Sequence, residues 1–138
     1  MKQLLTILFI GLLSFSINAQ AKIDFESETI DYGTIEKGSN GVRVFKFTNT
    51  GDEPLIISKV SSSCGCTIPK KPKDPILPGK TGEIEVKYDT NRVNPIRKTI
   101  TVISNAADTP TVALKIKGLV VDPDKANILE KKDKSVMQ

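Results

Sequence analysis

Residues 83–88 read Glu83-Ile84-Glu85-Val86-Lys87-Tyr88, and this alternation of charged and apolar side chains is the clearest indication of the fold. A period of two puts the apolar side chains on one face of an extended strand and the charged ones on the other. Residues 112–117 repeat the pattern, and residues 42–48 and 96–103 are rich in β-branched and aromatic side chains, which favour strands. The sequence therefore predicts strands that each have one buried face.

The strand predicted at residues 42–48 has an irregular pattern, because its apolar face changes sides between Val44 and Phe45. Such a change predicts either a bulge or a strand that is covered on both faces. Shorter strands are expected at Lys22–Phe25, Thr29–Tyr32 and Leu55–Val60.

Turn residues separate these segments at the spacing of a β-sandwich. Glycine, proline, asparagine and aspartate gather at residues 37–41, 49–54, 77–82 and 104–110. About seven short strands in roughly a hundred residues predict an all-β chain with a single antiparallel β-sandwich of immunoglobulin-like type. True immunoglobulin domains also have a core tryptophan and a disulfide between the sheets. This chain has no tryptophan, and its two cysteines, which are separated by a single residue, cannot bridge two opposed sheets.

The first twenty residues have the pattern of a secretory signal peptide. Lys2 precedes an apolar run from Leu4 to Leu13, which is too short to span a bilayer comfortably, and small residues follow it. We expect cleavage after Ala19, and Ala21 offers a second site two residues later. No cysteine lies near either position to carry a lipid, so the mature protein is expected to be soluble, periplasmic or secreted, and without an integral membrane segment.

These patterns divide the chain into a signal peptide at residues 1–20, a β-sandwich at 21–121 and a charged, flexible tail at 122–138. The formal net charge is +4, but the lysines are scattered along the predicted strands and the tail. The one tight basic cluster, Lys70, Lys71 and Lys73, lies among prolines that predict a rigid loop. With so few aromatic side chains to stack on bases, we expect no nucleic-acid partner.

Catalytic arrangements are largely excluded by the absence of histidine. Without histidine the chain has no Ser-His-Asp triad, no Cys-His pair and no histidine-bearing metal motif. The sixteen carboxylates lie mostly among the polar positions of the alternating strands, where a solvated surface explains them. We therefore expect no catalytic residues and no enzymatic activity.

Cys64-Gly65-Cys66 contains both cysteines and is the one candidate site. In a strand, Cys64 and Cys66 would face the same side, near the upper limit of distance for a disulfide, and a turn at Gly65 would bring them closer. The interpretations left open are a structural disulfide, thiol–disulfide exchange, a link between chains and metal binding. Zinc needs four ligands, whereas copper(I) accepts few thiolates, so copper(I) is the metal expected if Cys64 and Cys66 bind one.

Several segments of residues 23–121 occur in an order that resembles a known family. They are Asp31–Thr34, Phe45–Gly51, Pro54–Ile57, Ser63–Thr67 and Leu77–Gly82. Phe45–Gly51 and Pro54–Ile57 resemble the wider group of Hydin-like and sperm-protein-like immunoglobulin folds. The Ser63–Thr67 segment, Ser-Cys-Gly-Cys-Thr, is the specific one, and with it the chain resembles the bacterial domain of unknown function 1573. Tyr32 stands where that family tends to have phenylalanine, so its hydroxyl must find water or a partner. The resemblance implies an exported immunoglobulin-like module with no established activity.

The predicted function is that of a non-enzymatic interaction or structural module, which contacts an envelope or secreted protein through a sheet edge or a loop end. The alternative is thiol–disulfide exchange or copper(I) handling through Cys64-Gly65-Cys66. No cofactor is expected apart from copper(I) in that alternative.

Overall fold

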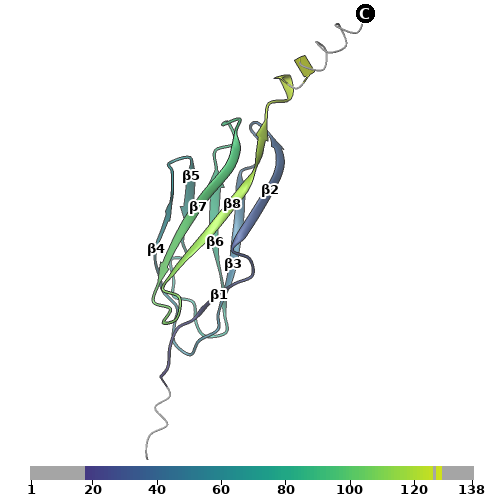
Figure 1. The fold of residues 1–138 in the computed structure, drawn as a ribbon. Coiled ribbons are helices and arrows are strands. Elements are labelled where there is room, and N and C mark those ends of the chain that lie inside the picture. Colours follow the sequence, from purple (N-terminus) through teal and green to yellow (C-terminus); the bar gives the residue numbers. More distant parts are fainter. Residues whose placement is uncertain (1–17, 126, 129–138) are drawn as a thin grey trace, which may run out of the picture.

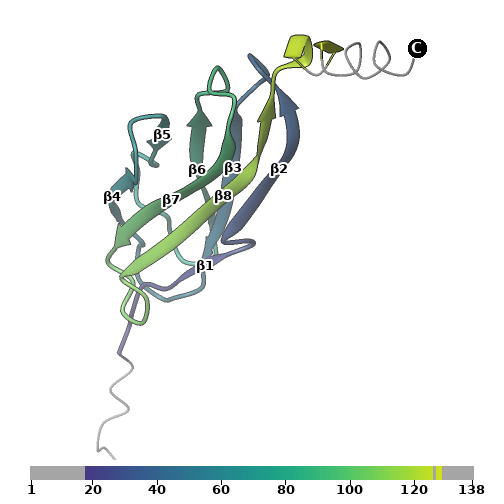
Figure 2. The same ribbon diagram turned by 45° about the horizontal axis from the view of Figure 1, so that its top comes forward.

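The computed structural model describes residues 18–125 and 127–128, and most of the predicted signal peptide and tail lies outside this part of the chain. Eight strands pack as two four-stranded sheets (Figures 1 and 2). The first sheet has the order β1 (Ile23–Phe25), β3 (Val42–Asn49), β6 (Thr81–Tyr88), β5 (Thr67–Lys70). The second has the order β2 (Thr29–Glu36), β8 (Thr111–Val121), β7 (Pro95–Ser104), β4 (Ile57–Ser62). The predicted all-β, immunoglobulin-like sandwich is confirmed, with eight strands instead of about seven.

One ladder departs from the antiparallel arrangement, because β2 runs parallel to β8. β1 pairs antiparallel with β3 in the other sheet, so the chain changes sheets between Phe25 and Thr29. The remaining ladders are antiparallel. The segment β1–β2 therefore borders both sheets on one side of the sandwich, and β4 and β5 border them on the other (Figure 2).

The alternation predicted for residues 83–88 is confirmed, because Ile84, Val86 and Tyr88 are buried and the charged side chains between them are exposed. In β3, Phe45 and Phe47 are buried whereas Val44 is 37% exposed. The register between β3 and β6 is continuous. Both expectations for this strand, a bulge and coverage on two faces, are therefore wrong, since the apolar run simply leaves Val44 at the surface.

A strand was missed around Pro69, where the sequence predicts a rigid loop. Thr67–Lys70 forms β5, an edge strand paired with β6. The N–H of Asp89 donates to the carbonyl of Cys66 (2.9 Å), and the alternation that starts there puts Pro69 opposite Val86 in a non-hydrogen-bonded pair. The nitrogen of Pro69 thus faces the open edge, where the strand needs no donor.

The segment Phe45–Gly51 has a structural role that centres on Asn49. The fully buried side chain of Asn49 joins three parts of the chain. Its Nδ2 donates to the carbonyls of Glu53 (2.7 Å) and Ile76 (2.9 Å), and its Oδ1 accepts from the N–H of Gly51 (3.0 Å). A Cβ at Gly51 would collide with the carbonyl oxygen of Gln20. The segment therefore holds the chain around Gln20 close to the loop after β3, and ties that loop to the one before β6.

The hydroxyl of Tyr32 finds a partner inside the protein, since it donates to the carbonyl of Gly41 at 2.8 Å. Its ring meets the ring of Tyr88 edge-on, and the guanidinium of Arg43 lies 4.3 Å from the ring centroid. Burial raises the pKa of Tyr32 above its ordinary value, and the charge of Arg43 opposes this shift.

The described chain enters at one end of the sandwich and leaves at the other (Figure 1). Residues 123–125 and 127–128 are helical, and the Oδ1 of Asp122 accepts from the N–H of Asp124 (3.2 Å), as a helix N-cap does. Within the described residues, no helix has the length and apolar character needed to cross a membrane.

Candidate functional site

Cys64 and Cys66 lie in the turn between β4 and β5 and are joined by a disulfide. Their Cα atoms are 5.4 Å apart, well within the range that disulfides favour. Gly65 lies in a turn, exposed to solvent, which is the arrangement that brings the two cysteines closer than an extended strand would.

Backbone hydrogen bonds anchor this turn at both of its ends. Before it, the N–H of Ser63 donates to the carbonyl of Thr99 (3.0 Å). After it, the carbonyl of Cys66 accepts from the N–H of Asp89 (2.9 Å). The turn is therefore tied to β7 and to the β6–β7 loop without help from the disulfide.

The two sulfur-bearing side chains differ in exposure. Cys66 is 7% exposed and belongs to the hydrophobic core, with its Sγ 3.9 Å from the Oγ1 of Thr67. Cys64 is half-buried and packs against the same core. A reagent from solvent therefore has easier access to Cys64 than to Cys66.

Lys98 is a neighbour of this turn that sequence reasoning missed. The N–H of Ser63 bonds to the carbonyl of Thr99, just beyond the last residues of the β4–β7 ladder, and Lys98 is the next residue along β7 on the side of the turn. Lys98 is half-buried, and no carboxylate of the described residues lies within salt-bridge distance of it. Of the cations nearest in sequence, Lys59 pairs with Ile103 on β7, and Lys70 lies opposite Glu85 in the other sheet. The Nζ of Lys71 donates to the carbonyl of Ile57, at the start of β4 (3.3 Å).

The open edge of β4 ends at this turn. Three of the four edge strands are blunted in ways that discourage added strands: β1 has three residues, β5 contains Pro69, and β2 has a register shift beside Gly33, whose φ is +66°. In β4 the register shift lies between Ile57 and Lys59, so residues 59–62 form a regular edge. Because Ser63 bonds to β7, alternation turns the backbone groups of Val60 and Ser62 away from β7.

A family model described as "Protein of unknown function (DUF1573)" matches residues 23–120, which span both sheets and the disulfide turn. The chain belongs to the DUF1573 family. The resemblance found in the sequence is thereby confirmed. No curated protein matches the sequence.

Solved structures share the fold of this DUF1573 chain at low sequence identity. A protein of unknown function from Porphyromonas gingivalis W83 has a TM-score of 0.67 and 18% identity, over 79% of this chain and 51% of that one. The ASH / PapD-like domain 7 of human CEP192 has a TM-score of 0.61 and 10% identity, over 80% and 94%. The Vibrio cholerae VesB protease has a TM-score of 0.57 and 15% identity, over 80% and 35%. The DUF1573 chain thus spans about half of the first protein and about a third of the protease, and these likenesses show the fold alone.

No group of three or more metal-binding side chains of the histidine, cysteine, aspartate or glutamate type occurs among the described residues of the DUF1573 chain. The sulfur atoms of Cys64 and Cys66 are in a disulfide, so neither is a thiolate. Copper(I) binding at these residues would require the disulfide to be reduced first. It stays a prediction.

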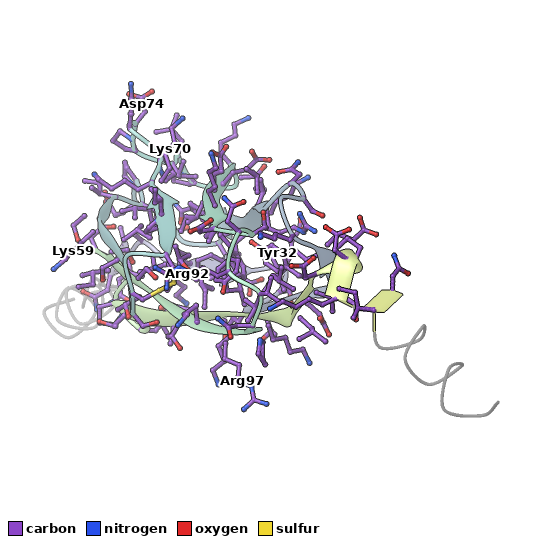
Figure 3. All side chains as sticks on the ribbon, turned by 90° about the horizontal axis from the view of Figure 1, so that it is seen from above. Tyr32, Lys59, Lys70, Asp74, Arg92 and Arg97 are labelled. Atoms are coloured by element: carbon purple, nitrogen blue, oxygen red, sulfur yellow. A yellow bond between two sulfur atoms is a disulfide. The ribbon has the colours of Figure 1, made fainter. Side chains whose placement is uncertain are left out.

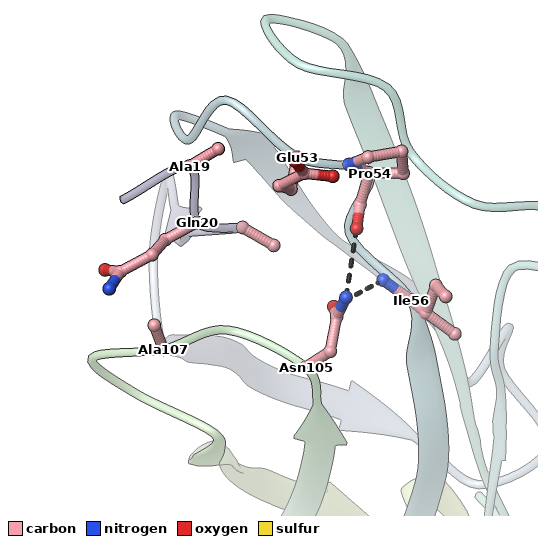
Figure 4. A pocket seen from close by; sticks show the side chains of 8 residues that line it. Ala19, Gln20, Glu53, Pro54, Ile56, Asn105 and Ala107 are labelled. Atoms are coloured by element: carbon pink, nitrogen blue, oxygen red, sulfur yellow. Dashed lines mark hydrogen bonds between the residues drawn. The ribbon is translucent and has the colours of Figure 1, made fainter. Parts of the chain in front are cut away.

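A hollow at the other end of the sandwich has a structural explanation (Figure 4). Asn105 spans it, donating from Nδ2 to the carbonyl of Pro54 (3.0 Å) and accepting at Oδ1 from the N–H of Ile56 (2.7 Å). The other lining residues are Ala19, Gln20, Ala21, Glu53 and Ala107. With a single titratable side chain, Glu53, this hollow has no pair of groups for acid–base chemistry.

Proposed function

We propose that this DUF1573 chain is an exported, non-enzymatic interaction module that binds an extended segment of another envelope or secreted protein along β4. The observation that carries the proposal is the regular open edge at residues 59–62, in a sandwich whose other edge strands are blunted. An extended segment placed beside β4 would form backbone hydrogen bonds with Val60 and Ser62.

These bonds alone predict a weak complex. Two outward-facing residues offer four backbone hydrogen bonds, and each contributes about 1 kcal/mol net. Association costs at least about 4 kcal/mol, so the partner must also contact side chains near the edge. Ile68 of β5, on the same border of the sandwich, is 65% exposed and offers such a contact.

The likeness to known folds supports this proposal at the level of fold. The CEP192 domain is named PapD-like, and the YadV chaperone has a TM-score of 0.50 and 12% identity, over 74% of this chain and 52% of that one. Chaperones bind other proteins, and an exposed β-edge is a common means of doing so.

The test combines hydrogen exchange with an edge-blocking variant. In the isolated protein, the amides of Val60 and Ser62 are expected to exchange faster than the amide of Ser63, which bonds to β7. Val60→Pro removes one outward-facing donor while leaving the ladder bonds to β7, much as Pro69 does in β5. We expect Val60→Pro to weaken capture of a partner from an envelope extract, and bound partner to slow hydrogen exchange at the Val60 amide of the wild type.

The matched control is Val44→Lys, which changes an exposed apolar residue on the outer face of the other sheet. It is expected to leave capture unchanged. Equal capture by wild type and Val60→Pro, with both folded by circular dichroism, would rule out the β4 edge as the binding site.

Thiol–disulfide exchange is the second candidate function, and the independent anchoring of the cysteine turn favours it. Because Ser63 and Cys66 are held by backbone bonds, the disulfide can open while the strands on both sides stay in place. Lys98, on the side of β7 towards this turn, would stabilise a thiolate at Cys64.

The exchange would use a partner protein with two thiols. One partner thiolate attacks the Sγ of Cys64, the bond between Cys64 and Cys66 breaks, and Cys66 leaves as a thiolate that takes up a proton. The second partner thiolate then attacks the mixed disulfide and releases Cys64. The partner loses two electrons to become a disulfide, and the domain becomes a dithiol.

A dithiol peptide tests this candidate, with the mixed disulfide and the products followed by intact mass. Lys98→Met is expected to slow the reoxidation of the reduced domain, while Lys98→Arg keeps its rate near that of wild type. A disulfide that resists the peptide in the folded protein would exclude this role. Reduced wild type that binds copper(I), with Cys64→Ser failing to do so, would support copper handling instead.

A further inference from the structure

The outer face of the β2-β8-β7-β4 sheet is strongly basic. Its outward-facing, exposed cations come from three strands, and two carboxylates of β2, Asp31 and Glu36, accompany them. Arg97 projects from the sheet into solvent in Figure 3, and Lys59 projects at the side. We call this the basic face; its cations are Lys59, Arg97, Lys115 and Lys117.

The other sheet has a balanced outer face, which makes the basic face a specific property of one side. There the register pairs opposite charges directly: Lys46 lies opposite Glu83, and Lys70 lies opposite Glu85. Such pairs stabilise a sheet. The excess of positive charge is therefore concentrated on the outer side of one sheet.

Two cations of the basic face are placed at a cost to stability. Arg97 lies directly opposite Lys117 in the β7–β8 register, and like charges in that position are destabilising. Lys115 lies two residues before Lys117 on the same side of β8. The carboxylate of Asp31, 3.7 Å from the Nζ of Lys117, is the one salt-bridge partner found there among the described residues. Local departures from what stability favours are characteristic of functional sites.

A shallow hollow of about 330 Å³ lies among these cations. Thr29 of β2 and Thr99 of β7 flank Lys115 of β8 in the register, and the one apolar lining residue, Ile116, is 1% exposed. Its remaining lining residues are Thr29, Arg97, Lys98, Thr99, Lys115 and Lys117. The hollow thus combines positive charge with hydroxyl groups and has no aromatic side chain.

We propose that this hollow binds an acidic polysaccharide, whose carboxylate groups pair with Arg97 and Lys117 and whose hydroxyls bond to Thr29 and Thr99. Guanidinium binds a carboxylate through two parallel hydrogen bonds, and the interaction is strong because both partners are charged. A surface that inserts into a membrane needs exposed apolar side chains, which the hollow does not have. A nucleic-acid strand is favoured by aromatic stacking, which is also missing here. The proposal is independent of the β4 edge.

The test measures binding of the whole mature protein to polygalacturonate, with dextran as the uncharged polysaccharide and phosphatidylglycerol vesicles as the lipid surface. Arg97→Glu is expected to weaken polygalacturonate binding by about tenfold or more, which is the loss of one charge-assisted contact. The matched control is Lys46→Glu, with the same charge change on the other sheet. It is expected to alter binding by less than about twofold.

Thermal stability gives a second readout that separates binding from folding. Arg97→Glu replaces a like-charge pair with an opposite-charge pair across from Lys117, so its Tm is expected to equal or exceed that of wild type. Weaker binding with unchanged or raised Tm supports the proposal. Equal loss of binding in Lys46→Glu, stronger binding to the vesicles than to polygalacturonate, or no binding to polygalacturonate would each overturn it.

Discussion

Reduction of the Cys64–Cys66 disulfide is expected to lower the free energy of unfolding by only about 1 to 2 kcal/mol. The cysteines are two positions apart, so the bond closes a very small ring, and the loop-closure entropy of such a ring amounts to about 1 to 2 kcal/mol at 25 °C. The hydrogen bonds from Ser63 to Thr99 and from Asp89 to Cys66 join backbone groups, so they are expected to remain when the disulfide opens. In a domain of this size, the change corresponds to a Tm lower by about 3 to 10 °C.

The measurement is urea unfolding of one chain in both redox states, followed by far-ultraviolet circular dichroism, so that no side chain is substituted. Alkylation and intact mass establish the redox state of each sample, and the double variant Cys64→Ser/Cys66→Ser shows any effect of the reductant itself. If reduction lowers the free energy of unfolding by more than about 4 kcal/mol, which approaches the stabilisation from a disulfide that closes a hundred-residue ring, the small-ring estimate is wrong. The disulfide would then hold the fold together, and a role in thiol exchange would be untenable.

Three further predictions concern the core, the buried tyrosine and the entry of the chain. Asn49→Ala is expected to lower the free energy of unfolding by about 3 kcal/mol through loss of three buried hydrogen bonds, against about 1 kcal/mol for the exposed Asn105→Ala; equal losses in urea unfolding would contradict this. Tyr32→Phe is expected to cost about 1 kcal/mol at pH 7 by removing the bond to Gly41. Burial raises the folded-state pKa of Tyr32 above 10.0, so as the pH rises the unfolded wild type releases the tyrosine proton before the folded protein does. The wild type therefore loses stability above about pH 10, and its advantage over Tyr32→Phe should narrow at those pH values. A constant difference would show that Tyr32 titrates alike in both states. The mature chain is expected to begin at Gln20, because its carbonyl accepts from the N–H of Asp52 (2.8 Å) and cleavage after Ala21 would remove this contact; N-terminal sequencing of the processed protein decides between the two sites.

The strands predicted correctly are those whose pattern is a local property. In residues 83–88 the alternation itself indicates which face is buried, and the structure buries that face. β5 was missed because proline usually ends a strand. Pro69 is tolerated there only because its nitrogen faces the open edge, and the edge position depends on how the two sheets are assembled.

In the cysteine turn, too, some features follow from local sequence and others depend on how the strands are assembled. The spacing of Cys64 and Cys66 allowed a disulfide, made easier by a turn at Gly65, but left thiol exchange, a link between chains and metal binding open. It could not indicate Lys98, because this residue is brought towards the cysteine turn only by the pairing of β4 with β7.

Local sequence was sufficient for the all-β class, the family and the position of the cysteine turn, because side-chain period, turn residues and short motifs are properties of neighbouring residues. Tertiary structure was needed for the open edge of β4, the side-by-side cations Arg97 and Lys117, and the parallel pairing of β2 with β8. Each of these depends on strand order and register between distant segments. Those are set by packing of the whole core, since a shift of one residue would turn every buried side chain outward.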